Sequence, residues 1–153
     1  MLTVDRPADL KAHAGRFLGQ SGWRTITQAD ISAFAELTGD DHWIHVDTAR
    51  AAAEMPDGKT IAHGLFLLAL VPRLQRELYR IERRGSGLNY GYEKVRFLSP
   101  VPVDSRIRLA LTLVDVAEHP RGTRIVTQST IELENADRPA LVADHIILVA
   151  DAS

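Results

Sequence analysis

Apolar positions in the first third of the chain recur at helical spacing and predict a helix over Gln28–Leu37. The residues that carry this pattern are Ile31, Phe34 and Ala35. Thr27 can cap the start of the helix and Gly39 can end it. A shorter, alanine-rich helix is predicted over Thr48–Glu54, with Asp47 as its cap. The polar segment between the two helices, residues 38–47, is predicted to be an ordered loop.

A strongly apolar helix is predicted to begin at Gly64. Its sequence, GLFLLALVPRLQRELYRIERR, is apolar on nearly every side at first and then amphipathic through Leu74, Leu78 and Ile81. We expect this helix to start in the core and to emerge into solvent. Because Pro72 removes one backbone donor, a kink or a restart is expected there.

After Gly85 the apolar period changes to that of strands, and four segments are predicted: Asn89–Leu98, Arg106–Val116, Thr123–Glu134 and Ala140–Val149. Short turn-rich connections favour antiparallel pairing of successive strands. The economical packing is a sheet that curls around the apolar helix, which makes the predicted fold class α+β. No glycine-rich fingerprint stands between a strand and a helix, so Rossmann and P-loop folds lose support.

Composition narrows the function classes. The 153 residues suit one domain, predicted over residues 1–153, and a formal charge of −2 offers no global attraction to nucleic acid or anionic membranes. The lack of cysteine removes disulfides and thiolate chemistry and fits a cytoplasmic location. The longest apolar run, Leu65–Val71, is far shorter than the roughly 18 residues that span a bilayer.

Two loops carry candidate chemistry. Asp40 and His45 are five residues apart and can address a common point if the backbone curls, although a turn aspartate and a structural histidine would give the same spacing. The run Ile61-Ala62-His63-Gly64 places a glycine at a helix N-terminus, where free N–H groups can hold an oxyanion. Alternatively, Gly64 permits close packing and His63 caps the helix, and both interpretations can hold together.

These motifs resemble a known family. The run FAELTGDDHWIHVD, followed by KTIAHGLFLLAL, looks like the MaoC-like (R)-specific enoyl-CoA hydratase family. The tryptophan in the first run and the later Leu88-Asn89-Tyr90-Gly91 are similar to its nodulation-protein-N branch. The resemblance covers about residues 23–102, and the last two strands are predicted from their pattern alone.

The resemblance implies a single hot-dog domain, usually a homodimer, with an active site near the subunit interface and a tunnel for the acyl chain. It assigns the catalytic pair to Asp40 and His45, and the oxyanion donor to the N–H of Gly64. We also expect His63 and His42 to contact substrate, His42 standing where the family usually has Asn or Gln. The implied reaction interconverts a trans-2-enoyl-CoA and a (3R)-3-hydroxyacyl-CoA, without a metal or other cofactor, since coenzyme A is part of the substrate.

Three alternatives remain open. A metal could bind among acidic and histidine side chains of the two loops: Asp40, His42, His45, Asp47 and His63. A thioesterase of the same fold would attack the thioester carbonyl carbon, and a non-catalytic module would only bind acyl thioesters.

The basic run 80–84 is expected to be a solvated helix end, with contact to coenzyme A phosphates as a weaker alternative shared with Lys94 and Arg96. His13, His119 and His145 are expected to be structural or surface residues.

Overall fold

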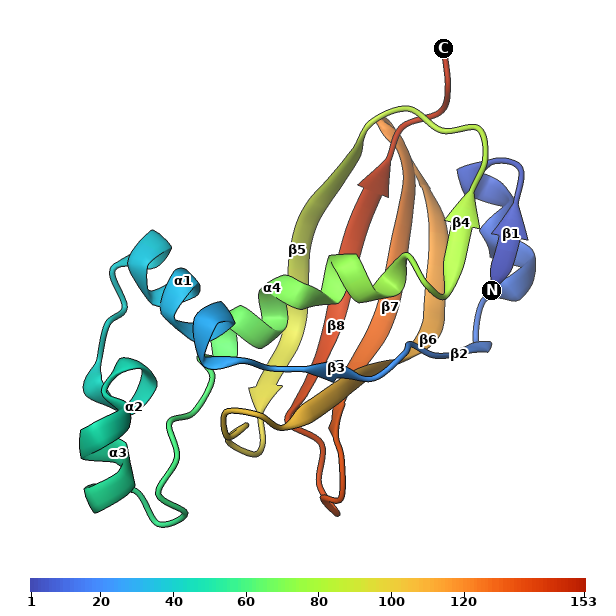
Figure 1. The fold of residues 1–153 in the computed structure, drawn as a ribbon. Coiled ribbons are helices and arrows are strands. Elements are labelled where there is room, and N and C mark those ends of the chain that lie inside the picture. Colours follow the sequence, from blue (N-terminus) through green and yellow to red (C-terminus); the bar gives the residue numbers. More distant parts are fainter.

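The computed structural model describes residues 1–153 and consists of an antiparallel sheet with helix α4 lying across it (Figure 1). The strands are β1 Leu2–Val4, β2 Phe17–Gln20, β3 Arg24–Thr25, β4 Tyr79–Ile81, β5 Gly87–Phe97, β6 Arg106–His119, β7 Gly122–Leu133 and β8 Leu141–Val149. The helices are the 3₁₀ helix η1 Pro7–His13, and α1 Gln28–Thr38, α2 Trp43–Val46, α3 Thr48–Glu54 and α4 Gly64–Gln75. None of the helices combines the length and the apolar character needed to cross a bilayer.

The main sheet has six strands in the order β2-β6-β7-β8-β5, with β3 also paired to β6. All these pairs are antiparallel, as the short connections predict. Four alternate residues of β6 are at most 1% exposed: Ile107, Leu109, Leu111 and Leu113. They form the buried face that the alternating pattern predicts: the first three pack in the core beneath α4, and Leu113 packs in a second cluster with Val4 and Leu10.

Helix α4 supplies the other half of the core. Five of its apolar side chains are buried: Phe66, Leu67, Leu70, Val71 and Leu74. Burial of each such side chain contributes about 1.5–3 kcal/mol, which explains why so apolar a segment lies against the sheet. The chain remains helical through Pro72, and no restart separates the two parts.

The predicted extent of the apolar helix is wrong. Helix α4 ends at Gln75, and Tyr79–Ile81 forms strand β4, which pairs in parallel with β1. The apolar residues Leu78 and Ile81 fit a helix face, but here they are buried beside the N-terminal strand. Because the pairing partner lies about 77 residues earlier in the sequence, a local pattern could not reveal it. The basic run 80–84 is therefore not a helix end.

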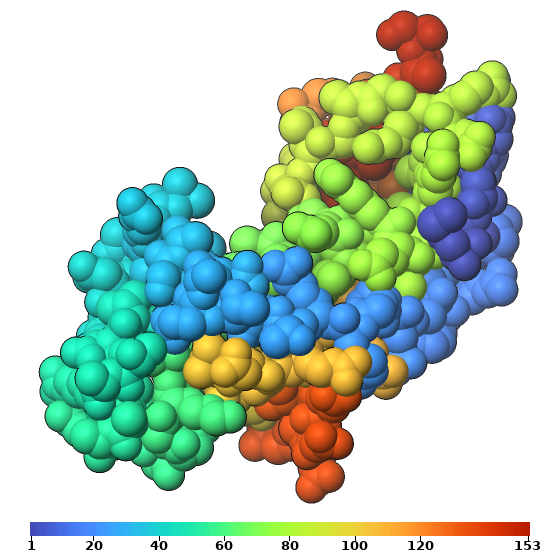
Figure 2. All heavy atoms as spheres, in the orientation of Figure 1, coloured from blue at the N-terminus to red at the C-terminus, as the bar shows by residue number.

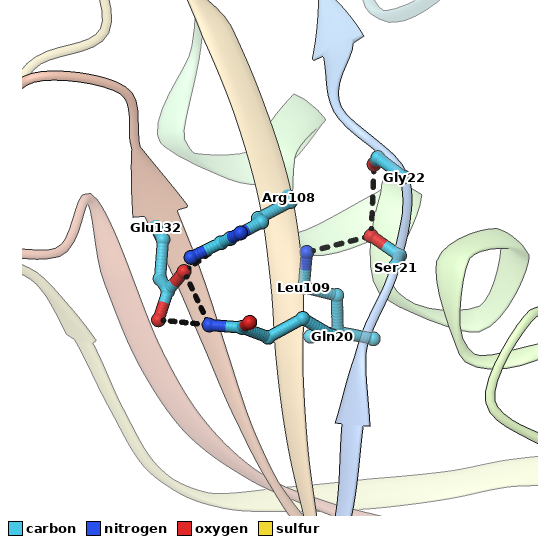
Figure 3. A network of polar contacts seen from close by, with 6 residues as sticks. All are labelled: Gln20, Ser21, Gly22, Arg108, Leu109 and Glu132. Carbon is cyan, nitrogen blue, oxygen red and sulfur yellow. Dashed lines mark hydrogen bonds and ion pairs between the residues drawn. The ribbon is translucent and has the colours of Figure 1, made fainter.

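The sequence pattern also gave no sign of the N-terminal elements β1 to β3 and η1. Strand β2 is held by side chains as well as by its short ladder (Figure 3). The Gln20 amide donates to both carboxylate oxygens of Glu132, at 3.1 and 3.0 Å, and Arg108 pairs with the same carboxylate. Ser21 exchanges two hydrogen bonds with the backbone of Leu109. These contacts fix the segment that leads into α1.

Helices α1 to α3 lie at the end of α4 that begins with Gly64, beyond the edge of the sheet (Figure 1). The predicted capping of α1 is present: the Thr27 hydroxyl accepts from the Asp30 N–H at 3.1 Å, and Gly39 takes a left-handed conformation with φ 77°. Part of the predicted loop is helical, since α2 forms one turn over Trp43–Val46. The chain therefore places residue 40 and residue 45 on either side of a tight bend.

Candidate active site

His45 lies on α2 with 8% of its surface exposed. Its Nδ1 is 2.7 Å from the carbonyl oxygen of Ile61. A carbonyl oxygen can only accept, so Nδ1 carries the hydrogen and Nε2 keeps its lone pair in the neutral ring. The hydrogen bond also fixes the orientation of the imidazole. His45 is therefore set to accept a proton at Nε2.

His63 immediately precedes α4 and is 3% exposed. Its Nε2 donates to the backbone oxygen of Asp40 at 2.8 Å, and its buried Nδ1 has no partner. The ring stacks on that of His45, with centroids 3.8 Å apart, and lies 4.9 Å from the ring of Phe34. The Nδ1 atom is thus free to form a hydrogen bond, and a buried polar atom without a partner is rare enough to indicate a ligand site.

Asp40 follows the left-handed Gly39 at the end of α1 and is exposed. One potential ligand atom from each of Asp40, His45 and His63 lies within 4.8 Å of the others. The structure therefore brings the predicted pair together and adds His63 to it. Two members of this set can accept the two hydrogens of one water molecule, and the set has the ligand-atom types that a divalent transition metal would use.

His42 lies outside this three-residue cluster. It is exposed, its ring is 5.9 Å from that of Trp43, and its backbone oxygen accepts the N–H of His45 at 2.9 Å. Its charge would disfavour protonation of His45, so it can affect the site without contacting substrate. Asp47, another residue of the metal alternative, caps α3 by accepting from the N–H of Arg50.

Burial is the largest influence on His45 and lowers its pKa below the ordinary value of 6.5. The hydrogen bond to Ile61 opposes this change, and the charges of His63 and Asp40 act in opposite directions. The net effect keeps the ring neutral near pH 7. A neutral His45 has the lone pair that a general base requires.

Gln28 positions the site and was not predicted from the sequence. Its amide donates to the backbone oxygen of His45 at 2.8 Å, and its side-chain oxygen accepts from the hydroxyl of Thr60 at 2.5 Å. Gln28 thus ties the start of α1 to α2 and to the loop before α4. Its place in the first turn of a predicted helix gave no signal of this role.

Gly64 opens α4, so its N–H belongs to the first turn and has no acceptor within the helix. A Cβ at this position would come within 2.7 Å of the ring of Phe97. The glycine therefore permits close packing, as one interpretation of the sequence held. The same lack of a side chain leaves the N–H open to a ligand, so the oxyanion interpretation is compatible with the structure.

Comparison with known proteins identifies the family of the chain. Residues 9–136 match the family model described as a MaoC like domain. The chain is 50% identical over 148 residues to 3-hydroxyacyl-thioester dehydratase Z of Mycobacterium tuberculosis, a match that covers 96% of this chain and 97% of the relative. It is 40% identical over 144 residues to Nodulation protein N of Rhizobium leguminosarum bv. viciae, covering 93% and 89%.

Solved structures confirm the hot-dog fold. The unliganded R-hydratase PhaJ1 from Pseudomonas aeruginosa superposes with a TM-score of 0.71 at 20% identity, covering 90% of this chain and 82% of that one. The (R)-hydratase from A. caviae gives a TM-score of 0.70 at 19% identity, covering 88% and 95%. With the family model matching most of its length and close relatives aligned almost end to end, the chain belongs to the MaoC-like family.

Proposed function

We propose that the protein is an (R)-specific hydro-lyase that interconverts trans-2-enoyl-CoA and (3R)-3-hydroxyacyl-CoA. The observation that carries the proposal is the convergence of Asp40, His45 and His63 beside the first turn of α4. The 50% identity to a 3-hydroxyacyl-thioester dehydratase supports the same reaction class. The (R) stereochemistry and the coenzyme A thioester come from the family resemblance.

The proposed hydration begins with one water held between Asp40 and His45. Both the carboxylate and the His45 Nε2 accept hydrogen bonds, so they would engage the two hydrogens of the water and leave its oxygen free to attack C3. One of the pair takes a proton from the water as the C–O bond forms, and a proton is delivered to C2. Dehydration runs through the same steps in reverse.

The thioester carbonyl acquires negative charge during this addition. The N–H of Gly64 has no acceptor within α4 and lies at the positive end of the helix dipole. We propose that it donates to the carbonyl oxygen and stabilises the enolate-like intermediate. Each step uses groups of the protein, so the proposed reaction needs no metal or other cofactor.

We propose that the protein acts as a homodimer joined through β5. This strand ends the sheet and pairs only with β8, so its outer edge carries unpaired backbone groups. Three large apolar residues of β5 are also about half exposed to solvent, with exposed fractions of 52% for Leu88, 52% for Tyr90 and 51% for Phe97. A second copy could satisfy both features by antiparallel pairing about a twofold axis.

One observation supports the metal alternative: Asp40, His45 and His63 each offer a ligand atom, and these atoms lie within 4.8 Å of one another. The stacked orientation of the two imidazoles argues against it, because rings inclined by only 23°, with centroids 3.8 Å apart, direct their in-plane lone pairs side by side and not at one point. Metal analysis of the purified protein and activity after treatment with a chelator distinguish the two. An activity that disappears with the metal and returns on its addition would replace the acid/base proposal.

The test of function follows the loss of enoyl-thioester absorbance with crotonyl-CoA and longer trans-2-enoyl-CoAs. Asp40→Asn and His45→Gln should each lower kcat by at least about 100-fold, the usual contribution of an acid or base, with little change in folding. The product should be the (3R)-hydroxyacyl thioester. Release of free coenzyme A from saturated acyl-CoA would instead indicate a thioesterase, and binding without turnover would indicate a non-catalytic module.

A further inference from the structure

A cavity of about 460 Å³ lies at the C-terminal end of α4, at the opposite end of the helix from His63. Residues of α4, β4, β5 and β8 line it. Figure 2 shows a hollow framed by the yellow-green atoms of the segment around residues 75–90, with red atoms of β8 at its floor. The volume is within the range of small-molecule sites. No step of the proposed mechanism uses this cavity.

Three arginines line the cavity, and no acidic residue does: Arg76, Arg80 and Arg84. Arg80 is paired with Glu82 at 3.5 Å, whereas Arg76 and Arg84 have no ion-pair partner. Like charges around one hollow repel each other, and an anion bound between them would reverse the sign of this interaction. Guanidinium groups are also well suited to carboxylates and phosphates, which they can bind through two parallel hydrogen bonds.

Neutral polar groups complete the lining. The amide nitrogen of Gln75, a residue only 3% exposed, donates to buried partners that include Thr127 and His145. Its side-chain oxygen accepts no hydrogen bond in the protein, although Gln75 lines the cavity. The hydroxyl of Tyr79 likewise has no partner, and burial raises the pKa of Tyr79 to about 12 against the opposing charge of Arg84, so the hydroxyl remains a donor. Neither atom is sealed from solvent, so both are available to hydrogen bond a polar ligand that enters the cavity.

One face of α4 connects the cavity with the active site. Leu65, which is 60% exposed, and Ala69 are followed on the same face by Pro72 and Arg76, which line the cavity. The face begins beside Gly64, and the helix covers about 16 Å from Gly64 to Gln75 at about 1.5 Å per residue. An extended molecule lying along this apolar face would reach both ends.

We propose that the cavity binds the anionic end of an elongated substrate whose apolar part lies along the exposed face of α4. This inference rests on the proposed hydratase function. The shared chemistry is a carboxylate or phosphate that meets Arg76 and Arg84, with Gln75 and Tyr79 as neutral partners. It has two possible sources, a carboxylate at the far end of the acyl chain or a phosphate of coenzyme A.

The test compares the wild type with the double variant Arg76→Ala/Arg84→Ala. The matched control is Arg73→Ala, since Arg73 is an exposed arginine of α4 that neither lines the cavity nor forms an ion pair. The substrates are trans-2-dodecenoyl-CoA, its counterpart with a terminal carboxylate, and the corresponding pantetheine thioesters, which lack the nucleotide phosphates.

If the acyl carboxylate is bound, the double variant should lose at least about tenfold more kcat/KM on the carboxylate-ended substrate than on the plain chain, as expected for hydrogen bonds to a charged group. If a coenzyme phosphate is bound, the same excess loss should separate CoA from pantetheine thioesters. Arg73→Ala should show neither difference. A double variant that matches Arg73→Ala on every substrate overturns the cavity proposal and leaves the hydratase function intact.

A second measurement reads the cavity without turnover. Calorimetric titration of dodecanedioate and of adenosine 3′,5′-bisphosphate should show binding of at least one to the wild type and about tenfold weaker binding to the double variant. Absence of turnover with intact binding would contradict the proposed function alone. Absence of binding to the wild type by both probes would contradict the cavity proposal alone.

Discussion

Two hydrogen bonds to backbone carbonyls decide what the histidines of the site can do. Ile61 holds the hydrogen of His45 on Nδ1, and the backbone of Asp40 holds that of His63 on Nε2. The sequence motif placed Asp40, His45 and His63 on neighbouring loops, but the acceptors are main-chain atoms whose identity does not depend on residue type. The residues of the site were therefore predictable, whereas their tautomers and the positioning role of Gln28 were not.

The lowered pKa of His45 makes a prediction about the pH dependence of activity. Protonation of Nε2 would remove the proposed base, and burial shifts this event to a pH below 6.5. In the hydration direction kcat/KM should fall towards acidic pH with a midpoint below 6.5. A stopped-flow or absorbance assay on both sides of this midpoint, with a stability check at each pH, measures the profile. An acidic limb centred above pH 6.5 would contradict the assignment of His45 as a buried neutral base.

Gly64 and Phe97 permit a test that separates packing from chemistry. In Gly64→Ala the new methyl would lie 2.7 Å from the Phe97 ring, so the ring must move, and we expect a loss of about 1–2 kcal/mol in the free energy of unfolding. Adding Phe97→Ala should relieve this strain. If close approach of the thioester to Gly64 matters, the double variant should remain at least about tenfold less active than Phe97→Ala alone. Equal activity of these two variants would leave Gly64 with a packing role only.

At the scale of elements, the helices and strands that carry a local signal match their predicted bounds closely, as α1 and α3 do. The errors lie where a distant partner determines the conformation. Residues 79–81 leave the helical pattern because β1 pairs with them, and β2 depends on the Glu132 network on β7. Strand β6 continues to His119, three residues beyond its predicted end, because its ladder with β7 continues to the turn.

A buried polar cluster joins α4 to the sheet and was not predicted, although His145 was expected to be structural or superficial. His145 is fully buried, accepts from the Gln75 amide at Nδ1 at 3.1 Å, and donates from Nε2 to Asn89 at 3.0 Å. Its ring also stacks on Tyr92 at 4.5 Å. A proton on Nδ1 would face the Gln75 donor. The arrangement therefore requires a neutral ring, and the structural interpretation of His145 is confirmed.

The buried cluster around His145 predicts that the protein becomes less stable at acidic pH. Burial lowers the pKa of His145 from 6.5 to about 4, so between these values the unfolded chain binds a proton that the folded chain does not. Stability should thus fall as the pH drops from 6.5 towards 4, by up to about 3 kcal/mol from this residue. Urea unfolding at pH 7.5 and 4.5 should show a smaller difference for His145→Gln than for the wild type. His13→Gln, a change outside the core, should retain the wild-type difference, and an equal difference in all three proteins would exclude His145 as the cause.

At the scale of the whole molecule, the predicted α+β class and the hot-dog fold are confirmed, because a single apolar helix followed by antiparallel strands has few ways to bury its surface. Composition could not locate the cavity beyond Gln75, since the segments that line it come from four separate elements. The cytoplasmic location stays a prediction. So does the homodimer, for which the exposed edge of β5 provides the structural argument.

Strand β5 makes the dimer testable. Near its start Leu88 lines the arginine cavity, and at its end Phe97 contacts Gly64, so a second copy on this strand would border both sites. Tyr90→Lys places a charge on the apolar surface between them, and twofold symmetry would bring two such charges into one interface.

Sedimentation velocity should show a dimer for the wild type and at least about tenfold weaker association for this variant. Val114→Lys, at a residue of β6 that is 44% exposed, should remain dimeric. Activity that falls on dilution in parallel with dissociation would mean that the partner helps to form the site, whereas a wild type that sediments as a monomer would remove β5 as the interface.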